Sequence, residues 1–373
     1  MVARYLFYSH DGYGLGHVRR NTLITRAVLE IDPDAQVSLV TGLDVRPRWA
    51  LPTGRVRVHR VPALLKATDG SFRQERLSFG DAVRERERVF ETLVDEERPD
   101  VVVVDRHPYG TAGELRRGLD LARRRGSALV LGLRDVLDEP SVVREEMRGG
   151  GWAEVEDVYH DVLVYGGRHF VDHEAEYGLS ISPHYCGWVV EPPGPSRPGS
   201  NLFVVAAGGG GDGAAVFELG ARLLNHRRDL VGLFAPGPYA DADALRRLSE
   251  LVSGGACVVN PWDACGRWFS RAGAILCAAG YNSTLEALAA GQRPILMPRR
   301  NPRREQPIRA EWLAGLGLAD VVEPGADPVG VASLLREPRA LHEGALEAAG
   351  IDLDGARNAA LRLHALSAAG SLR

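Results

Sequence analysis

A glycine turn at the start of a predicted helix is the feature of the sequence with the clearest chemistry. An apolar strand that ends at Ala278 precedes the turn, a helix from about Asn282 to Ala290 follows it, and a second apolar strand spans Pro294 to Met297. Residues 280–283 therefore lie at a helix N-terminus, where unpaired N–H groups and the helix dipole favour an anion. Glu286 can accept hydrogen bonds from a ribose whose diphosphate rests on the turn. The spacing predicts a nucleotide site.

This segment resembles the donor-binding signature of nucleotide-sugar glycosyltransferases of the GT-B fold. The likeness is strongest to the family that includes the N-acetylglucosaminyl transferase of peptidoglycan synthesis and the antibiotic and plant glycosyltransferases. The resemblance implies a phosphate turn, a ribose-binding acid and an acidic-amide pair that holds donor sugar hydroxyls. The residues it implies are Gly280, Tyr281, Asn282, Ser283, Glu286, Glu305 and Gln306.

One departure from the family pattern concerns the phosphate charge. Many members carry a His or Arg two residues before the turn glycine, and Ala278 stands there in this chain. Other residues must therefore neutralise the negative charge of the diphosphate. The arginine group of residues 299–304 either meets it or forms a solvated turn.

A second glycine loop, residues 208–213, follows the apolar run 201–206 and precedes a helical pattern. Its four consecutive glycines allow several backbone N–H groups to face a diphosphate. The loop also fits the Gly-x-Gly-x-x-Gly fingerprint, but no acid stands at the end of the next strand, about twenty residues on, where a nicotinamide cofactor needs one. The resemblance assigns the loop to the donor diphosphate or the reacting centre, and Trp262 to the pocket of the donor base. The alternatives are a plain tight turn and a core tryptophan. The donor residues expected here are Gly209, Gly210, Gly211, Asp212 and Trp262.

The glycine loop near the N-terminus carries a candidate general base. His17 follows Gly14 and Gly16 where the loop becomes a helix, at the carboxyl end of the first strand, so its side chain can point out of the core. The element resembles the acceptor-side loop of the same glycosyltransferases. In several of them the matching His deprotonates the acceptor hydroxyl. The resemblance thus makes His17 catalytic and places Gly16 beside the donor.

A base needs an orienting partner, and Asp105 is the first candidate. It ends the apolar strand 101–105, and its carboxylate can hold the ring of His17 in the productive tautomer. Asp11, inside the loop, and the nearby His107 compete for this role. The alternative is structural: His17 braces its own loop and Asp105 caps a helix that begins near Thr111.

Short apolar runs alternate with helical patterns along the chain, which predicts parallel sheets wrapped by helices. A chain of 373 residues is too long for one ordinary core. Residues 191–200 hold four prolines and no apolar period, and are predicted to be a linker. We therefore expect an α/β protein with two doubly wound, Rossmann-like domains that face each other across a cleft: 1–190 for the acceptor and 201–373 for the donor. In the GT-B family a last helix such as 354–369 often crosses back to the first domain.

Composition excludes several classes of partner. The net charge of −4 gives no general attraction to nucleic acid. The four cysteines show neither a Cys-x-x-Cys pair nor zinc-like spacing, and we expect neither a metal nor a cofactor apart from the nucleotide-sugar co-substrate. No signal-peptide pattern and no run of eighteen apolar residues occurs, which predicts a cytoplasmic protein with at most peripheral membrane contact.

The expected activity is that of an inverting, metal-independent glycosyltransferase. It would move a sugar from a UDP- or dTDP-sugar to a hydroxyl or amine of a small molecule, as in antibiotic biosynthesis, or of a lipid-linked acceptor. The first alternative is a nucleotide-sugar hydrolase, because hydrolases of sialic-acid-like sugar synthesis carry a similar loop, matched by Gly14, Gly16, His17 and Arg20. The second alternative is a non-catalytic nucleotide-sugar-binding protein or a membrane-docked scaffold.

Overall fold

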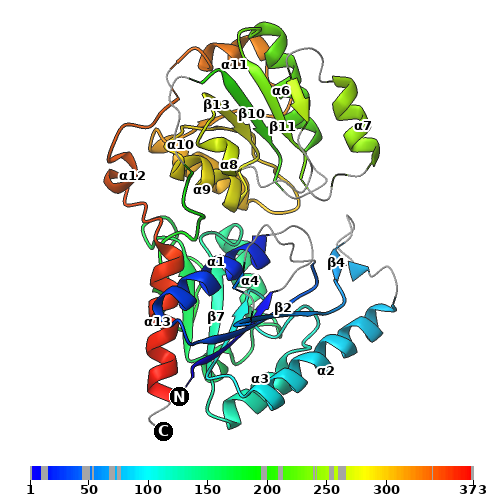
Figure 1. Ribbon diagram of the computed structural model, residues 1–373, viewed down its shortest axis with the longest axis vertical. Helices are drawn as coiled ribbons and strands as arrows, with labels where there is room; N and C mark the ends of the chain where they lie inside the picture. The colour runs from blue at the N-terminus through cyan, green and yellow to red at the C-terminus, as the bar shows by residue number, and fades with distance from the viewer. Residues whose placement is uncertain are drawn as a thin grey trace. The chain divides into compact units, whose positions relative to one another are not determined.

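A computed structural model shows two compact units (Figure 1). The first unit comprises Met1–Val189 with Asp352–Arg373, and the second comprises Val190–Ile351. The described residues are 2–9, 16–43, 51–52, 54–66, 72–73, 77–194, 200–208, 213–237, 240, 242–251, 256–258, 266–337 and 339–370. Among these residues, no helix is long and apolar enough to cross a membrane.

The first unit contains a parallel sheet with strand order β3-β2-β1-β6-β7-β8-β9. The strands are β1 (Arg4–Ser9), β2 (Gln36–Thr41), β3 (Val56–Arg60), β6 (Val101–Asp105), β7 (Ala128–Arg134), β8 (Asp161–Tyr165) and β9 (His184–Tyr185). A separate antiparallel pair joins β4 (Leu65–Lys66) to β5 (Phe72–Arg73). Every residue of β6 is buried, as expected for a parallel strand that is covered on both faces. The strand order reverses at β1 and β6, which makes their carboxyl ends the expected ligand position.

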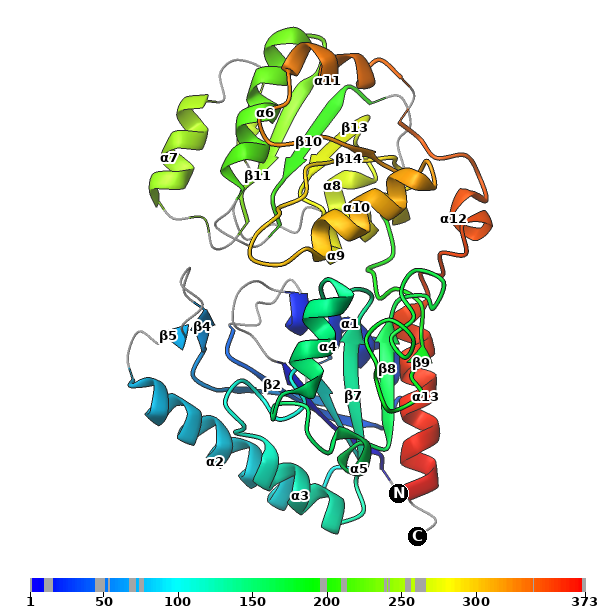
Figure 2. The same cartoon turned by 180° about the vertical axis from the view of Figure 1, so that it is seen from behind.

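Helices cover both faces of this sheet (Figure 2). On one face, α1 packs against α13, and on the other α2 packs against α3. The helices of this unit are α1 (Gly16–Ile31), α2 (Phe79–Glu97), α3 (Arg116–Arg124), α4 (Pro140–Arg148), α5 (Val155–Val158) and α13 (Gly355–Gly370). The last helix is joined to the sheet by hydrogen bonds, including one between the Tyr5 and Ser367 hydroxyls at 3.0 Å and one from Arg362 Nε to Asp161 Oδ2 at 2.5 Å.

The helix expected to begin near Thr111 begins instead at Arg116, so that boundary was wrong. Gly110 and Gly113 both have positive φ angles, of 83° and 86°, which no helix accommodates. The Glu114 carboxylate accepts a hydrogen bond from the Ala112 N–H at 2.9 Å, so the backbone is satisfied in a turn rather than in a helix.

The second unit contains a parallel sheet with strand order β12-β11-β10-β13-β14-β15. Its strands are β10 (Leu202–Ala206), β11 (Val231–Ala235), β12 (Ala256–Val258), β13 (Ala274–Cys277), β14 (Ile295–Leu296) and β15 (Asp320–Val321). Its helices are α6 (Ala214–His226), α7 (Ala242–Leu251), α8 (Gly266–Phe269), α9 (Tyr281–Ala289), α10 (Glu305–Gly315), α11 (Pro328–Leu334) and α12 (Ala345–Ala348). The order reverses at β10 and β13, so both units are doubly wound.

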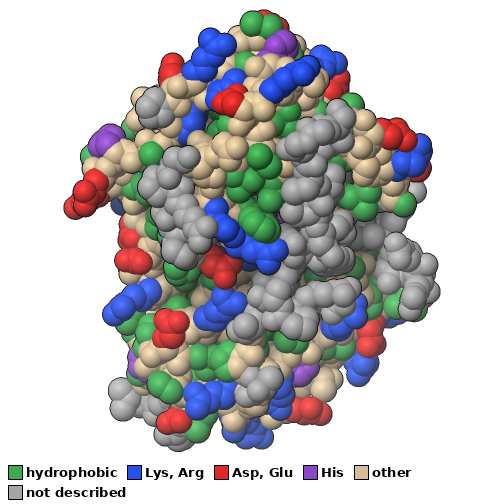
Figure 3. Space-filling view, turned by 45° about the horizontal axis from the view of Figure 1, so that its top comes forward, with side chains coloured by type: hydrophobic (Ala, Val, Ile, Leu, Met, Phe, Trp, Pro, Cys, Tyr) green, Lys and Arg blue, Asp and Glu red, His purple; other side chains and the backbone are tan. Residues whose placement is uncertain are grey.

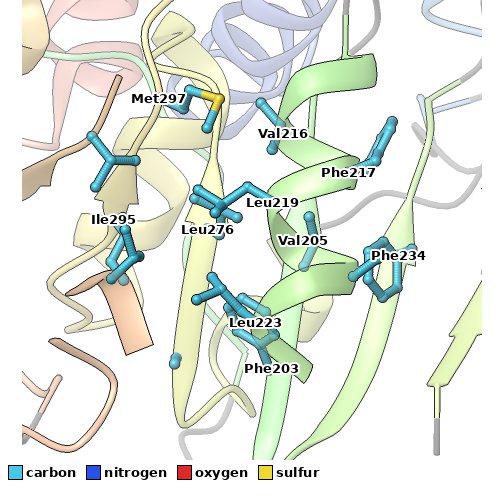
Figure 4. Packing of buried hydrophobic residues seen from close by; sticks show 14 of the residues in the cluster. Phe203, Val205, Val216, Phe217, Leu219, Leu223, Phe234, Leu276, Ile295 and Met297 are labelled. Carbon is cyan, nitrogen blue, oxygen red and sulfur yellow. The ribbon is translucent and has the colours of Figure 1, made fainter. Parts of the chain in front are cut away.

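The core of the second unit lies between α6 and the sheet (Figure 4). Val216, Leu219 and Leu223 recur at helical spacing on α6 and are buried against Val205 of β10 and Leu276 of β13. This packing fixes the carboxyl ends of β10 and β13, where the two glycine turns begin.

Close packing of α6 on the sheet depends on Gly220. A Cβ built there would lie 2.8 Å from Val205 Cγ2 and 3.2 Å from Phe234 Cε1. We expect Gly220→Val to lower the free energy of unfolding by about 1–3 kcal/mol through overpacking. Gly315→Val is the matched control, because nothing lies within 4 Å of a Cβ there, and it should change stability by less than about 0.5 kcal/mol. Chemical denaturation measures both, and equal losses would contradict the packing argument.

Charged side chains of both signs are interspersed on the face shown in Figure 3. Several ion pairs of the described residues join close neighbours in the sequence, such as Arg88 and Glu85 at 2.7 Å and Arg168 and Asp172 at 2.8 Å. Exposed pairs of this kind contribute little to stability.

Candidate active site

The start of the loop at residue 208 lies beside the N-terminus of α9. Ala206 of β10 pairs with Cys277 of β13, and the Ala278 N–H donates to the Ala206 carbonyl at 3.2 Å. A Cβ built on Gly208, whose φ is +75°, would lie 3.8 Å from Ser283 Oγ. The start of the first loop therefore meets the first turn of α9. Gly209, Gly210, Gly211, Asp212 and Trp262, which the sequence assigns to the donor, lie outside the described residues.

The N-terminus of α9 is not capped by a side chain. Gly280 is the N-cap residue, with φ −67° and ψ 149°, and the Thr284 N–H donates to its carbonyl at 3.1 Å. The hydrogen-bond ladder of the helix therefore starts at the Thr284 N–H, and residues 281–283 form the first turn that precedes it. A Cβ on Gly280 would meet open space. The turn thus has the geometry of an anion site.

A buried arginine forms a hydrogen bond with the backbone just before this turn. Arg309 of α10 is 2 % exposed, and its Nη1 donates to the Ala279 carbonyl at 2.8 Å. Its Cζ lies 5.7 Å from the centre of the Tyr281 ring. The sequence analysis missed this residue. The signal that could have found it is its position four residues after Glu305, on the same face of α10.

Glu286 lies on the second turn of α9 and is 5 % exposed. Its carboxylate lies against the start of α8, because a Cβ built on Gly266 would be 2.5 Å from Oε2. Gly266 therefore leaves room for the carboxylate, and any larger residue there would displace it.

The acidic-amide pair stands at the start of α10. Glu305 is 4 % exposed, and its Oε1 accepts a hydrogen bond from Arg299 Nη2 at 3.1 Å. Gln306 Oε1 accepts one from the Arg299 backbone N–H at 3.0 Å. Arg300 pairs with Glu323 at 2.5 Å. Arg299 and Arg300 belong to the arginine group that was considered for neutralising the phosphate. Both are ion-paired with carboxylates of their own unit.

In the first unit, the structure brings His17 and Asp105 together. Ser9, the last residue of β1, pairs with Asp105, the last residue of β6, so both strands end at the same edge. His17 Nδ1, on the first turn of α1, lies 3.2 Å from Asp105 Oδ1. The His17 side chain is 20 % exposed, whereas that of Asp105 is fully buried. Asp105 does not cap α3, whose N-cap residue is Leu115.

Arg20 is the strongest partner of Asp105. Its Nη2 lies 2.7 Å from Oδ1, 2.6 Å from Oδ2 and 3.2 Å from His17 Nδ1. Burial alone would raise the pKa of Asp105, but the charge of Arg20 and the contact with His17 outweigh it, so the pKa is lowered. Asp105 is therefore ionised at neutral pH. The sequence analysis noted Arg20 only as part of a loop pattern, although its spacing of three residues from His17 already places both on one helix face.

The turn after Asp105 has an unusual backbone. Arg106 and His107 follow one another with φ angles of 48° and 54°, a region that non-glycine residues rarely adopt. The Arg106 N–H donates to the Gly132 carbonyl at 2.9 Å, and its Nη2 donates to Glu146 Oε1 at 3.2 Å. These contacts hold the turn. His107 is half-buried there, and Asp11, the other competitor for the role of Asp105, lies outside the described residues.

Within the described part of the chain, no group of three or more His, Cys, Asp or Glu residues could hold a metal ion. Cys186 and Cys277 are buried, and neither forms a disulfide.

Comparison with known proteins identifies the fold. No protein-family model and no curated protein sequence matches the chain. The glycotransferase of kitacinnamycin superposes with a TM-score of 0.60 at 16% identity, over 100% of this chain and 98% of its own. Arabidopsis thaliana UGT89C1 gives 0.64 at 14%, over 98% and 100%. Acinetobacter baumannii MurG gives 0.54 at 15%, over all of both chains.

The protein has the GT-B fold. Its two doubly wound units correspond to the two Rossmann-like domains of that fold, which confirms the fold class predicted from the sequence. A variant of Os79 from O. sativa, 17% identical with a TM-score of 0.57, was solved in complex with UDP, and the parent Os79 with a trichothecene.

Proposed function

We propose that the protein is an inverting glycosyltransferase that moves a sugar from a UDP- or dTDP-sugar to a hydroxyl or amine of a small-molecule or lipid-linked acceptor. The observation that carries the proposal is the contact between His17 and the ionised Asp105 at the carboxyl edge of one unit of a GT-B fold. A partly exposed imidazole held by a buried carboxylate is suited to general-base catalysis.

The donor diphosphate would rest on the N–H groups of residues 281–283, beside the loop that starts at Gly208. These groups, the dipole of α9 and the buried Arg309 cation next to the turn would stabilise the negative charge that develops on the leaving diphosphate. This arrangement supplies the stabilisation without a metal. Arg309 would also supply the positive charge that a His or Arg supplies in relatives at the position of Ala278.

The remaining donor contacts fall to Glu286, Glu305 and Gln306. Glu286 would accept hydrogen bonds from the ribose hydroxyls. Gln306 Oε1 is already held by the Arg299 N–H, so its Nε2 would donate to the sugar, next to the Glu305 carboxylate. The likeness to structures solved with UDP supports a nucleotide donor.

The chemical step follows from these assignments. Asp105 holds the Nδ1–H of His17, so Nε2 takes the proton of the acceptor hydroxyl. The oxygen forms a bond to the anomeric carbon, the bond between that carbon and the phosphate oxygen breaks, and the electron pair leaves with the diphosphate. Attack opposite to the leaving group inverts the anomeric configuration.

A nucleotide-sugar hydrolase is the second candidate. The Arg20 contact favours it, because Arg20 completes the Gly-x-Gly-His-x-x-Arg pattern of such hydrolases and lies beside His17. In that case His17 would activate water instead of an acceptor.

Nucleotide release with and without acceptors separates these functions. A transferase keeps water from the anomeric carbon, so we expect nucleotide release to depend on the acceptor. A hydrolase would release free sugar from donor alone, at above about 1 s⁻¹. Mass spectrometry of reactions with UDP- and dTDP-sugars and a panel of acceptors measures both products, with the His17→Ala protein as the blank. Nucleotide binding without any turnover would indicate a binding protein.

A further inference from the structure

The Arg20 and Asp105 side chains form a buried ion pair directly beside His17. Arg20 is 2 % exposed and Asp105 is fully buried. The single nitrogen Nη2 contacts both carboxylate oxygens and lies 3.2 Å from His17 Nδ1. The carboxylate is therefore shared between a permanent cation and an imidazole.

The shared carboxylate determines the net charge of the group that lies beside His17. A buried carboxylate alone beside an imidazole favours the imidazolium, which cannot accept a proton from an acceptor. With Arg20 in place, the group next to His17 is a neutral pair. The carboxylate can still orient the ring, while the cation limits how strongly it stabilises the protonated form.

A chain of close contacts fixes Arg20 in this position. Its Cζ lies 5.0 Å from the centre of the Tyr165 ring on β8. Tyr165 in turn occupies the space left by Gly132 of β7, where a Cβ would lie 2.5 Å from the Tyr165 hydroxyl oxygen. Gly132 is also the strand partner of Asp105. A side chain at position 132 would therefore clash with Tyr165, which explains a glycine inside this buried strand.

We propose that Arg20 is a positioning residue that holds Asp105 and limits the protonation of His17, so that His17 can act as a base. The proposal rests on the proposed role of His17 and adds a residue that tunes it. Other titratable groups on neighbouring elements are Tyr165 on β8 and, in the turn after β6, His107 and Arg106, which pairs with Glu146 of α4. All of these stay in place in the variants below.

The titration of the His17 ring tests this in the full-length protein. Histidine-selective isotope labelling gives one set of ring signals for each of the 11 histidines, and His17→Ala identifies those of His17. We expect Arg20→Met to move the His17 midpoint up by roughly one to three pH units, because an uncompensated carboxylate remains. Asp105→Asn should move it down, because an uncompensated cation remains. The double variant should return it close to the wild-type value.

Shifts of opposite sign cannot come from a purely structural role. Arg339→Met is the control, because it removes a buried, ion-paired arginine of the second unit, which contacts Asp320 at 2.6 Å. It should leave the His17 midpoint unchanged. In active protein, the acid limb of the kcat/KM profile should follow the midpoint, so that Arg20→Met regains rate as pH rises.

Unmoved midpoints, or shifts of the same sign in both single variants, would overturn the proposal. If Arg20→Met does not fold, Gly132→Ala takes its place: it displaces Tyr165 without removing a charge, and we expect a smaller upward shift, with no shift counting against the role of Arg20. The titration needs no turnover. A wild-type protein without transferase activity would therefore refute the proposed function while leaving this test intact.

Discussion

His17→Ala should lower kcat by roughly 10²- to 10⁴-fold while nucleotide affinity stays near the wild-type value. The reason is that the ring meets Asp105 at 3.2 Å in the first unit, whereas the predicted diphosphate turn belongs to the second unit. Steady-state kinetics with a saturating donor gives kcat, and calorimetry with UDP or dTDP gives the affinity.

Two variants sharpen this result. Asp105→Asn should lower kcat in the same direction but by less, because the ring keeps a hydrogen-bonding neighbour and loses a charged one. His107→Ala, which changes the competing imidazole of the same edge, should retain most of the turnover. If His17→Ala instead loses thermal stability and keeps its turnover, the residue braces its loop and the base must be reassigned.

The second large effect concerns the donor. Glu286→Ala should weaken nucleotide diphosphate binding by about 1.5–3 kcal/mol, the value of a hydrogen bond to a charged group, or roughly 10- to 150-fold in Kd. Calorimetry with UDP and dTDP measures it.

Controls are needed because Glu286 is buried. Glu286→Gln keeps the volume next to Gly266 and should bind more weakly than wild type but more tightly than Glu286→Ala. Glu323→Ala removes an acid that pairs with the exposed Arg300 and should leave affinity unchanged. Wild-type affinity in a folded Glu286→Ala protein would remove Glu286 from the donor site.

Much of the fold could be predicted because parallel strands covered on both faces are short and continuously apolar. The strand 101–105 is the clearest case, and both of its ends were predicted correctly. The start of α3 was predicted too early, because Ala112, Glu114 and Leu115 favour a helix. The positive φ angles of Gly110 and Gly113 become visible only in the structure.

The candidate site, like the fold, could be predicted only in part from the sequence. The contact between His17 and Asp105 follows from topology, since the carboxyl ends of β1 and β6 meet wherever the two strands are neighbours. The positions of Arg20 and Arg309 depend on which way long side chains turn from a helix, and spacing alone does not determine that. Glu305 and Gln306 were predicted from a resemblance, which could not reveal their contacts with Arg299.

The most direct test of the central claim is to follow the anomeric proton by NMR while the protein acts on a UDP- or dTDP-sugar with an acceptor. The account predicts a new glycoside whose anomeric configuration is opposite to that of the donor, formed only when the acceptor is present. Retained configuration, free sugar as the main product, or an unchanged donor across the acceptor panel would contradict it.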